Sequence, residues 1–473
     1  MLDSHLKVEH HPRKIHLMLT DISDRIKHNP AGHHYGVAIF DADGDGASEI
    51  FVCGFGGPNR LLKYDGHQLR DIASPALADD GFRTVAAAAG DIDGDGREEL
   101  YVMNSDSFAG PKEQADRLFA NRSGGWEDLF STPVNWAARN LMAGRSVAAI
   151  DRRGTGRYGF FVANYSRPFK LFELAADGAI HDIAPAIGLN PTTGGRGLLV
   201  GPLASDRSDI FCVNEQGPNF LYRNTGLGTF LEIGSELNLA DALENARGVA
   251  VLDADGDGKL DIVYGNWEGP HRLMMRQPNG TFKDRATPAM ALPSPVRTVI
   301  AADFDNDGYE ELFFNNMGEA NRLFKFDEVE GVWKMHPIGA ALEIEGFGTA
   351  AAVADIDNDG RLELLIAHGE QTPQPLSLFH VAEADGNWIR IQPLTRQGAP
   401  ARGALVRLTA GWRVQTRVID GGSGYLCQME PFAHFGLGRV PTVESVRITW
   451  PDGANQVVTA PPCRHTLRVP YPG

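Results

Sequence analysis

Five short acidic loops carry the residues whose types and spacing indicate chemistry. The first reads DADGDGASE over residues 41–49, and each copy has carboxylates at positions one, three, five and nine and a glycine at position six. Oxygen ligands that converge in a tight loop suit a hard cation, most simply Ca²⁺, and no thiolate or imidazole takes part to favour zinc or copper. The predicted ligands are Asp41, Asp43, Asp45 and Glu49; Asp91, Asp93, Asp95 and Glu99; Asp253, Asp255, Asp257 and Asp261; Asp303, Asp305, Asp307 and Glu311; and Asp355, Asp357, Asp359 and Glu363.

Acidic turns without metal are the alternative reading, because Asp and Gly are common turn residues. The fivefold repetition favours metal, since carboxylates crowded into nine residues repel one another unless a cation neutralises them. We therefore expect about five Ca²⁺ ions. Two related segments lack the ligand set: residues 146–164 keep Asp151 but have Arg153 and Thr155 at the next ligand positions, and residues 198–214 keep only scattered acids. We expect no calcium there.

Composition limits the class of protein. A chain of 473 residues is too long for one ordinary core, so two domains or a repeat array is expected. The net charge is −17, and the predicted ligands of the five loops are 20 of the 61 acidic residues, so the acidity is largely a metal-binding signature. Phosphate binding needs a basic face, which argues against a nucleic-acid partner. No apolar run approaches the length of a membrane span.

The loops sit in a repeat of about 50 residues. A small apolar run precedes each loop, a β-rich run follows it, and two more strand-like runs complete the unit, which is typical of a propeller blade. With the two decayed units, seven repeats are counted. The sequence therefore predicts an all-β fold: a seven-bladed β-propeller with calcium-binding loops over 31–385, and a small C-terminal β-sandwich or barrel over 386–473. Residues 1–30 form a lead-in, whose segment 15–23 is a candidate strand for closing the ring.

The repeats resemble FG-GAP/VCBS repeats, the calcium-loop blades also found in integrin α-subunit propellers. The C-terminal stretch resembles the ASPIC/UnbV domain, through GYLCQ (424–428), HFGLG (434–438) and VRITWPDG (446–453). The combination is similar to the cartilage acidic protein family of bacterial type. This resemblance implies the fold and the calcium but no particular activity. Its members are mostly exported, whereas the first 30 residues show no apolar signal core, so the sequence predicts a cytoplasmic protein, with export as the alternative.

Arginines recur just before the first strand of several repeats. Arg145, Arg196, Arg247 and Arg297 are spaced by 51, 51 and 50 residues, and Arg83 stands two residues further out, which preserves the strand face. First strands of blades line the central axis, so these five side chains are predicted to form a ring at one mouth of the channel. Such a ring suits a carboxylate, phosphate or sulfate. In the alternative, each arginine bridges to a neighbouring blade's carboxylate or carbonyl.

Two classes of function follow. The first is a calcium-stabilised binding or interaction protein, whose partner is an anionic small molecule or a protein. The second is an enzyme of lyase, isomerase or cyclase type, with its active site at the channel mouth. The first repeat offers His33, His34 and Tyr35 at the place of the arginine, and the seventh offers Phe347. His434 is a further catalytic candidate, although such a residue is more often a core or turn histidine. Cys427 and Cys463 are left as a possible disulfide pair.

Overall fold

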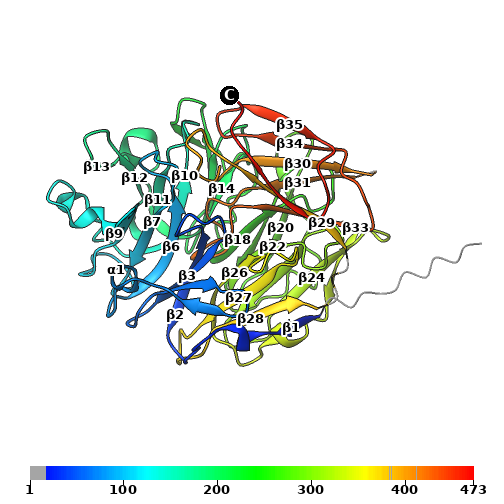
Figure 1. The fold of residues 1–473 in the computed structure, drawn as a ribbon, viewed down its shortest axis with the longest axis horizontal. Helices are drawn as coiled ribbons and strands as arrows, with labels where there is room; N and C mark the ends of the chain where they lie inside the picture. The colour runs from blue at the N-terminus through cyan, green and yellow to red at the C-terminus, as the bar shows by residue number, and fades with distance from the viewer. Residues whose placement is uncertain (1–17, 383, 385, 412) are drawn as a thin grey trace, which may run out of the picture.

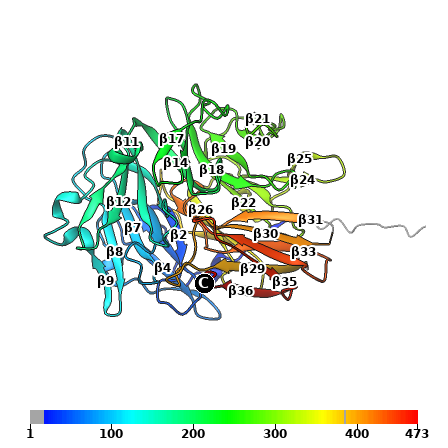
Figure 2. The same cartoon turned by 90° about the horizontal axis from the view of Figure 1, so that it is seen from above.

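The computed structural model describes residues 18–382, 384, 386–411 and 413–473. Within residues 18–382 the chain forms seven four-stranded units arranged as a ring, with the C-terminal strands, orange to red, packed beside it (Figures 1 and 2). The fold is the predicted seven-bladed β-propeller. Among the described residues, no helix is long and apolar enough to cross a membrane.

The first four blades contain these strands. Blade 1 has β2 (His34–Phe40), β3 (Glu49–Gly54), β4 (Arg60–Tyr64) and β5 (Leu69–Asp71). Blade 2 has β6 (Thr84–Gly90), β7 (Glu99–Asn104), β8 (Arg117–Arg122) and β9 (Gly125–Asp128). Blade 3 has β10 (Gly144–Ile150), β11 (Gly159–Pro168), β12 (Lys170–Leu174) and β13 (Ile180–Asp182). Blade 4 has β14 (Thr192–Gly201), β15 (Asp209–Asn214), β16 (Phe220–Asn224) and β17 (Phe230–Glu232), and β14 also pairs with β11.

The remaining blades close the ring. Blade 5 has β18 (Ala246–Leu252), β19 (Asp261–Asn266), β20 (Arg272–Arg276) and β21 (Phe282–Asp284). Blade 6 has β22 (Val296–Ala302), β23 (Glu311–Asn316), β24 (Arg322–Asp327) and β25 (Val332–His336). Blade 7 has β26 (Gly348–Ala354), β27 (Glu363–His368), β28 (Ser377–Val381) and, as its outer strand, β1 (Leu19–Asp21) from the N-terminus (Figure 1). Short helices join strands: η1 (Ser23–Arg25), α1 (Pro75–Ala78), η2 (Leu129–Ser131), η3 (Trp136–Ala138), η4 (Ala184–Ile187) and η5 (Ala340–Leu342).

Apolar clusters between neighbouring blades hold the ring together. Seven clusters fill the seven spaces, including the space between blades 7 and 1. Successive side chains of a strand point to opposite faces of the sheet, so one inner strand contributes to two apolar clusters. In β2, Val37 and Ile39 pack against blade 7, whereas Ala38 and Phe40 pack against blade 2. The small residues that precede each acidic loop therefore form the tightly packed inner strands of the blades.

The C-terminal domain is a sandwich of two sheets around its own apolar core. One sheet has the order β33 (Ala433–Gly438), β29 (Asn387–Pro393), β36 (His465–Val469); the other has β31 (Arg413–Val418), β30 (Leu405–Ala410), β34 (Ser445–Thr449), β35 (Asn455–Thr459). Cys427 and Cys463 are both free thiols, so the disulfide considered from the sequence is not formed.

Residues 420–430, which we call the channel segment, leave the sandwich and enter the propeller. Its strand β32 (Cys427–Gln428) pairs in parallel with β2, and Gly424 exchanges backbone hydrogen bonds of 2.7 and 2.8 Å with Val249 of blade 5. The fit is close: a Cβ on Gly36 would lie 2.5 Å from the carbonyl oxygen of Leu426. Glycine at position 36 is thus required by the neighbouring backbone, and the two domains share one interior.

Candidate functional site

The five acidic loops gather their carboxylates as the sequence predicts. In each loop, three carboxylates offer oxygen atoms that lie within 4.8 Å of one another: Asp41, Asp43 and Glu49; Asp91, Asp93 and Glu99; Asp253, Asp255 and Asp261; Asp303, Asp305 and Glu311; and Asp355, Asp357 and Asp359. The glycine at position six has a positive φ in all five, between 82° and 95°, which makes the sharp turn possible. Among the described residues, neither decayed unit contributes such a group.

The loops fit a divalent cation on two further grounds. Asp253 Oδ1, Asp355 Oδ1 and Glu363 Oε1 are buried without a hydrogen-bond partner, although buried carboxylate oxygens normally have one. Burial, together with Asp93 and Asp91, raises the pKa of Glu99 to about 8. Both observations indicate carboxyl groups whose ionised form lacks a compensating positive charge in the protein alone. All-oxygen coordination is what Ca²⁺ prefers, so these residues would hold the ion.

Two of the loops contain a lysine among the carboxylates. The ammonium of Lys63 lies 2.7 Å from Asp45 and 3.2 Å from Glu49, and that of Lys325 lies 2.8 Å from Asp307 and 3.0 Å from Glu311. Both lysines come from the third strand of their blade, β4 and β24. Numbering each loop by its blade, a cation bound in loop 1 or loop 6 must displace an ammonium group, so these loops are expected to bind a cation more weakly than the other three.

The C-terminal domain lies on the acidic loops. Gly436 donates a backbone hydrogen bond of 2.9 Å to Asp303 in loop 6, and Arg390 lies 3.2 Å from Asp355 in loop 7. Next to the loops, the fully buried Arg402 pairs with Glu98 at 2.5 Å. Further contacts join Arg468 to the Gly46 carbonyl, Arg407 to the Gly258 carbonyl and Arg417 to Glu310. The acidic loops and the domain interface therefore occupy the same face of the propeller.

His434 belongs to this interface. It is buried, and its Nε2 lies 2.6 Å from Asn306 Oδ1 in loop 6. Burial, with Arg390 and Arg417 nearby, holds its pKa well below the usual value, so the ring is neutral. Among the described residues, His434 does not line the axial cavity, and its burial and hydrogen bond fit the core role that the sequence analysis considered.

The axial cavity lies at the opposite mouth of the channel and has a volume of about 440 Å³. In every blade, the ladder between the first and second strands slips at one bulge, and the first residue that the ladder skips lines the cavity. Bulges redirect side chains that would otherwise alternate along the strand. These seven residues are, from blade 1 to blade 7, Tyr35, Val85, Arg145, Arg196, Arg247, Arg297 and Thr349.

The bulge corrects the predicted ring of five arginines to an arc of four. Blade 2 presents Val85, while Arg83 stays exposed, 5.7 Å from the Phe55 ring centroid, and lies outside the cavity lining. Blade 7 presents Thr349 in place of Phe347. Of the blade 1 candidates, only Tyr35 lines the cavity. His33 contacts the Gly369 carbonyl, and burial lowers the pKa of His34 to about 4, which keeps its ring neutral.

Four arginines and three carboxylates line the cavity, which leaves a formal charge of +1. Glu215 serves two arginines, Arg196 and Arg247, and Glu370 pairs with Arg297. The third carboxylate, Asp106, accepts backbone hydrogen bonds from Glu113 and Gln114. Burial and neighbouring positive charge lower the pKa of Arg247, although a guanidinium stays protonated at neutral pH. The positive charge is therefore only partly compensated.

Tyr425 of the channel segment lines the cavity together with the arginines. Its hydroxyl accepts a hydrogen bond of 3.0 Å from Arg196, and Arg297 lies 6.0 Å from its ring centroid. Burial favours the neutral phenol, but Arg196, Arg297, Arg145 and Arg247 outweigh it and lower the pKa of Tyr425 to about 8. Sequence reasoning missed this residue. The available signal was GGSGY (421–425), where glycines around a lone aromatic indicate close backbone contact.

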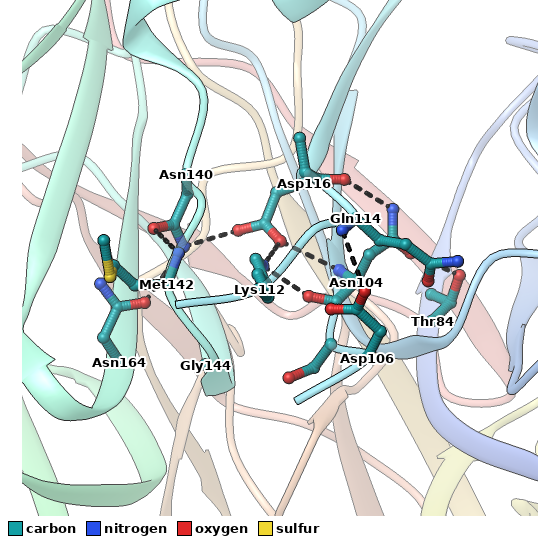
Figure 3. A network of polar contacts seen from close by, with 12 residues as sticks. Thr84, Asn104, Asp106, Lys112, Gln114, Asp116, Asn140, Met142, Gly144 and Asn164 are labelled. Atoms are coloured by element: carbon teal, nitrogen blue, oxygen red, sulfur yellow. Dashed lines mark hydrogen bonds and ion pairs between the residues drawn. The ribbon is translucent and has the colours of Figure 1, made fainter. Parts of the chain in front are cut away.

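A long loop of blade 2, residues 105–116, forms one wall and was also missed. Its Phe108 lies 4.8 Å from the guanidinium of Arg145, measured from the ring centroid. Figure 3 shows the anchor: Lys112 contacts Asp116 and the Asn104 carbonyl, and Asn140 of the next blade donates 2.7 Å to Asp116. Lys112 and Asp116 have fully buried side chains, so this network fixes the loop beside the arginine arc.

Comparisons with known proteins agree with this architecture. Residues 41–102, 206–264, 253–314 and 303–366 match the model of the FG-GAP-like repeat, and residues 394–473 match ASPIC and UnbV. Cartilage acidic protein 1 of Xenopus tropicalis is 47% identical over 92% of this chain and 74% of its own length. That of Homo sapiens is 46% identical over 94% of this chain and 73% of its own length. The chain belongs to the cartilage acidic protein 1 family.

The two family matches cover the two parts of the site, the acidic loops and the channel segment. In this member of the cartilage acidic protein 1 family, the FG-GAP-like matches cover all five acidic loops, and the ASPIC and UnbV match includes the channel segment with Tyr425. The ASPIC and UnbV region thus both covers acidic loops and contributes to the axial cavity.

Proposed function

We propose that this protein is an exported interaction protein whose propeller, stabilised by about five Ca²⁺ ions, binds a small anion in the axial cavity. The observation that supports this best is the arc of four arginines from consecutive blades around one cavity. Guanidinium groups recognise carboxylate, phosphate and sulfate through charge-assisted hydrogen bonds. The chain as a whole has a net charge of −17, so a cavity of positive charge differs from the rest of the molecule and attracts anions rather than cations.

The hydrogen bonds of the arc leave part of its donor capacity unused. Among the described residues, Arg145 has only carbonyl partners, those of Gly144 and Phe108. The Nε atoms of Arg196, Arg247 and Arg297 are buried without a partner. Bridges between blades are present as well, since Arg145 reaches the Phe108 carbonyl and Arg247 and Arg297 reach Glu215 and Glu370, so the variants below are needed to separate the two roles.

Replacing Arg247 by Ala tests the site. We expect the affinity for acetate, sulfate or phosphate to fall by about 1.5–3 kcal/mol, the value of a hydrogen bond to a charged group. Stability should change little, because Glu215 keeps Arg196 as a partner. Calorimetric titration and thermal melting of the same preparations measure the two quantities.

Arg83→Ala is the matched control, since Arg83 is exposed and outside the cavity; its anion affinity should equal that of the wild type. Arg145, Arg196 and Arg297 variants should lose unequal amounts of affinity. Similar losses of stability in all four cavity variants, with no anion binding by the wild type, would instead establish the arginines as structural bridges.

An enzyme with its active site in the same cavity is the second candidate. Tyr425 favours it, because a phenol whose pKa lies near 8 is suited to proton transfer at physiological pH. Tyr35 is less suited, since burial and Glu370 raise its pKa above the usual value. In this reading, the arginines hold an anionic substrate and Tyr425 donates or accepts the proton.

Anion binding should depend on pH through Tyr425. Below pH 8 the neutral phenol leaves the arginine charges available, whereas above it the phenolate neutralises part of them, so affinity should fall as the pH rises through about 8. Tyr425→Phe should remove this step and the corresponding tyrosinate absorbance change. Tyr35→Phe is the control and should keep both. An identical pH profile in the wild type and Tyr425→Phe would refute the assignment.

A further inference from the structure

The wall of the axial cavity changes in character around the ring. The four arginines come from the consecutive blades 3 to 6, and blades 7, 1 and 2 contribute Thr349, Tyr35 and Val85 at the equivalent bulges. We propose that the ligand is an organic acid with an apolar body of aromatic size, its acid group against the arginines and its body against blades 7, 1 and 2. This inference rests on the proposed function and specifies its ligand.

The side away from the arginines carries an apolar surface from blades 1 and 2 and the channel segment. Tyr35 and Phe55 lie with ring centroids 4.8 Å apart, and Val85 and Leu426 line the cavity beside them. Leu426 is contributed by the channel segment, next to Tyr425. Flat aromatic surfaces bind apolar groups by removing their surface from water, and a wall of this kind does nothing for an inorganic ion.

The carboxylates of the cavity limit the ligand to one acidic end. Glu370 reaches from blade 7 to Arg297, and Asp106 lies in the blade 2 loop that contacts Arg145 through Phe108, so the two carboxylates stand at the two ends of the arginine arc. A second acid group on the body of the ligand would meet these carboxylates, which repel it. The arrangement therefore favours an acid group at one end and a neutral body.

The volume supports the same conclusion. About 440 Å³ corresponds to roughly fifteen water molecules at about 30 Å³ each, and it lies in the usual range of about 300–1,000 Å³ for small-molecule sites. A tetrahedral oxyanion or acetate would leave most of this space to water. A ring system that carries a carboxylate would fill it and displace water from the apolar wall.

Calorimetric titration of the calcium-loaded protein, residues 1–473, with acetate, benzoate, naphthoate and the neutral naphthylmethanol tests the proposal. We expect affinity to rise at least tenfold from acetate to naphthoate, since one buried aromatic ring accounts for about that factor. Naphthylmethanol should bind at least tenfold more weakly than naphthoate, because it lacks the charge that the arginines recognise.

Two variants separate the two ends of the site. Arg247→Ala should weaken all three acids by a similar factor, whereas Phe55→Ala should remove most of the gain of naphthoate over acetate and leave acetate unchanged, with melting curves to verify folding. If acetate binds and naphthoate binds no more tightly, the ligand class is wrong while the anion site stands. If none of the acids binds to the wild type, the proposed function itself fails.

Discussion

Removal of calcium will lower the melting temperature by a large amount and loosen the C-terminal domain from the propeller. A site whose ligand is at one hundred times its dissociation constant stabilises the folded state by about 2.7 kcal/mol. Two such sites already equal the lower end of the stability of a typical domain, about 5–15 kcal/mol. Gly436 and Arg390 contact Asp303 and Asp355 directly, so repulsion in the empty loops also acts on the domain interface.

Melting curves in excess chelator and after calcium is restored measure this effect, and elemental analysis after gentle dialysis gives the number of ions. We expect about five ions and none in the loops around Asp151 and Asp209. Lys63→Met and Lys325→Met should bind calcium more tightly, because no ammonium has to be displaced. An unchanged melting curve with metal removal verified, or a count near seven, would contradict the prediction.

Arg402→Ala will destabilise the protein by about 3–5 kcal/mol, the cost of leaving a buried charge without its partner. Arg402 and Glu98 are nearly inaccessible to solvent, and the guanidinium also donates to the carbonyls of Ile39 and Asp420 at 3.0 and 2.7 Å. One side chain therefore joins the C-terminal domain to blades 1 and 2. Denaturant unfolding of the full-length protein measures the loss.

Two controls identify its cause. The double variant Glu98→Leu/Arg402→Met removes both charges and should recover most of the stability, since apolar pairs often replace buried ion pairs at little cost. Arg396→Met breaks the exposed pair with Asp452 and should cost no more than about 1 kcal/mol. Equal losses for Arg402→Ala and Arg396→Met would show that the buried pair has no special role.

The repeat made most of the fold predictable. Ligand positions within a loop are fixed by nine consecutive residues, so Asp253 and its four counterparts in the other loops could be assigned locally. The placement of Arg145, Arg196, Arg247 and Arg297 followed from their regular spacing on first strands.

The remaining features depend on long-range contacts or on backbone irregularities. A bulge between Thr84 and Ala86 turns Val85 into the cavity, and strict alternation, which pointed to Arg83, does not reveal it. Tyr425 reaches the arginines only because a segment more than 120 residues beyond Arg297 enters the channel, a contact that no periodicity encodes. The shared use of Glu215 likewise depends on two blades meeting.

The closure of the ring has a consequence for biosynthesis. Strand β1 has no partner until β28 of blade 7 has been made, and the inner edge of β2 in blade 1 stays open until β32 has been made, so two strands from the start of the chain wait for segments more than 350 residues further on. Such non-local pairings are slow to form, and unpaired edges invite association with other chains. Because the ring must accept the channel segment as it closes, the nascent propeller is expected to need protection, by chaperones or by low concentration, until synthesis has passed residue 428.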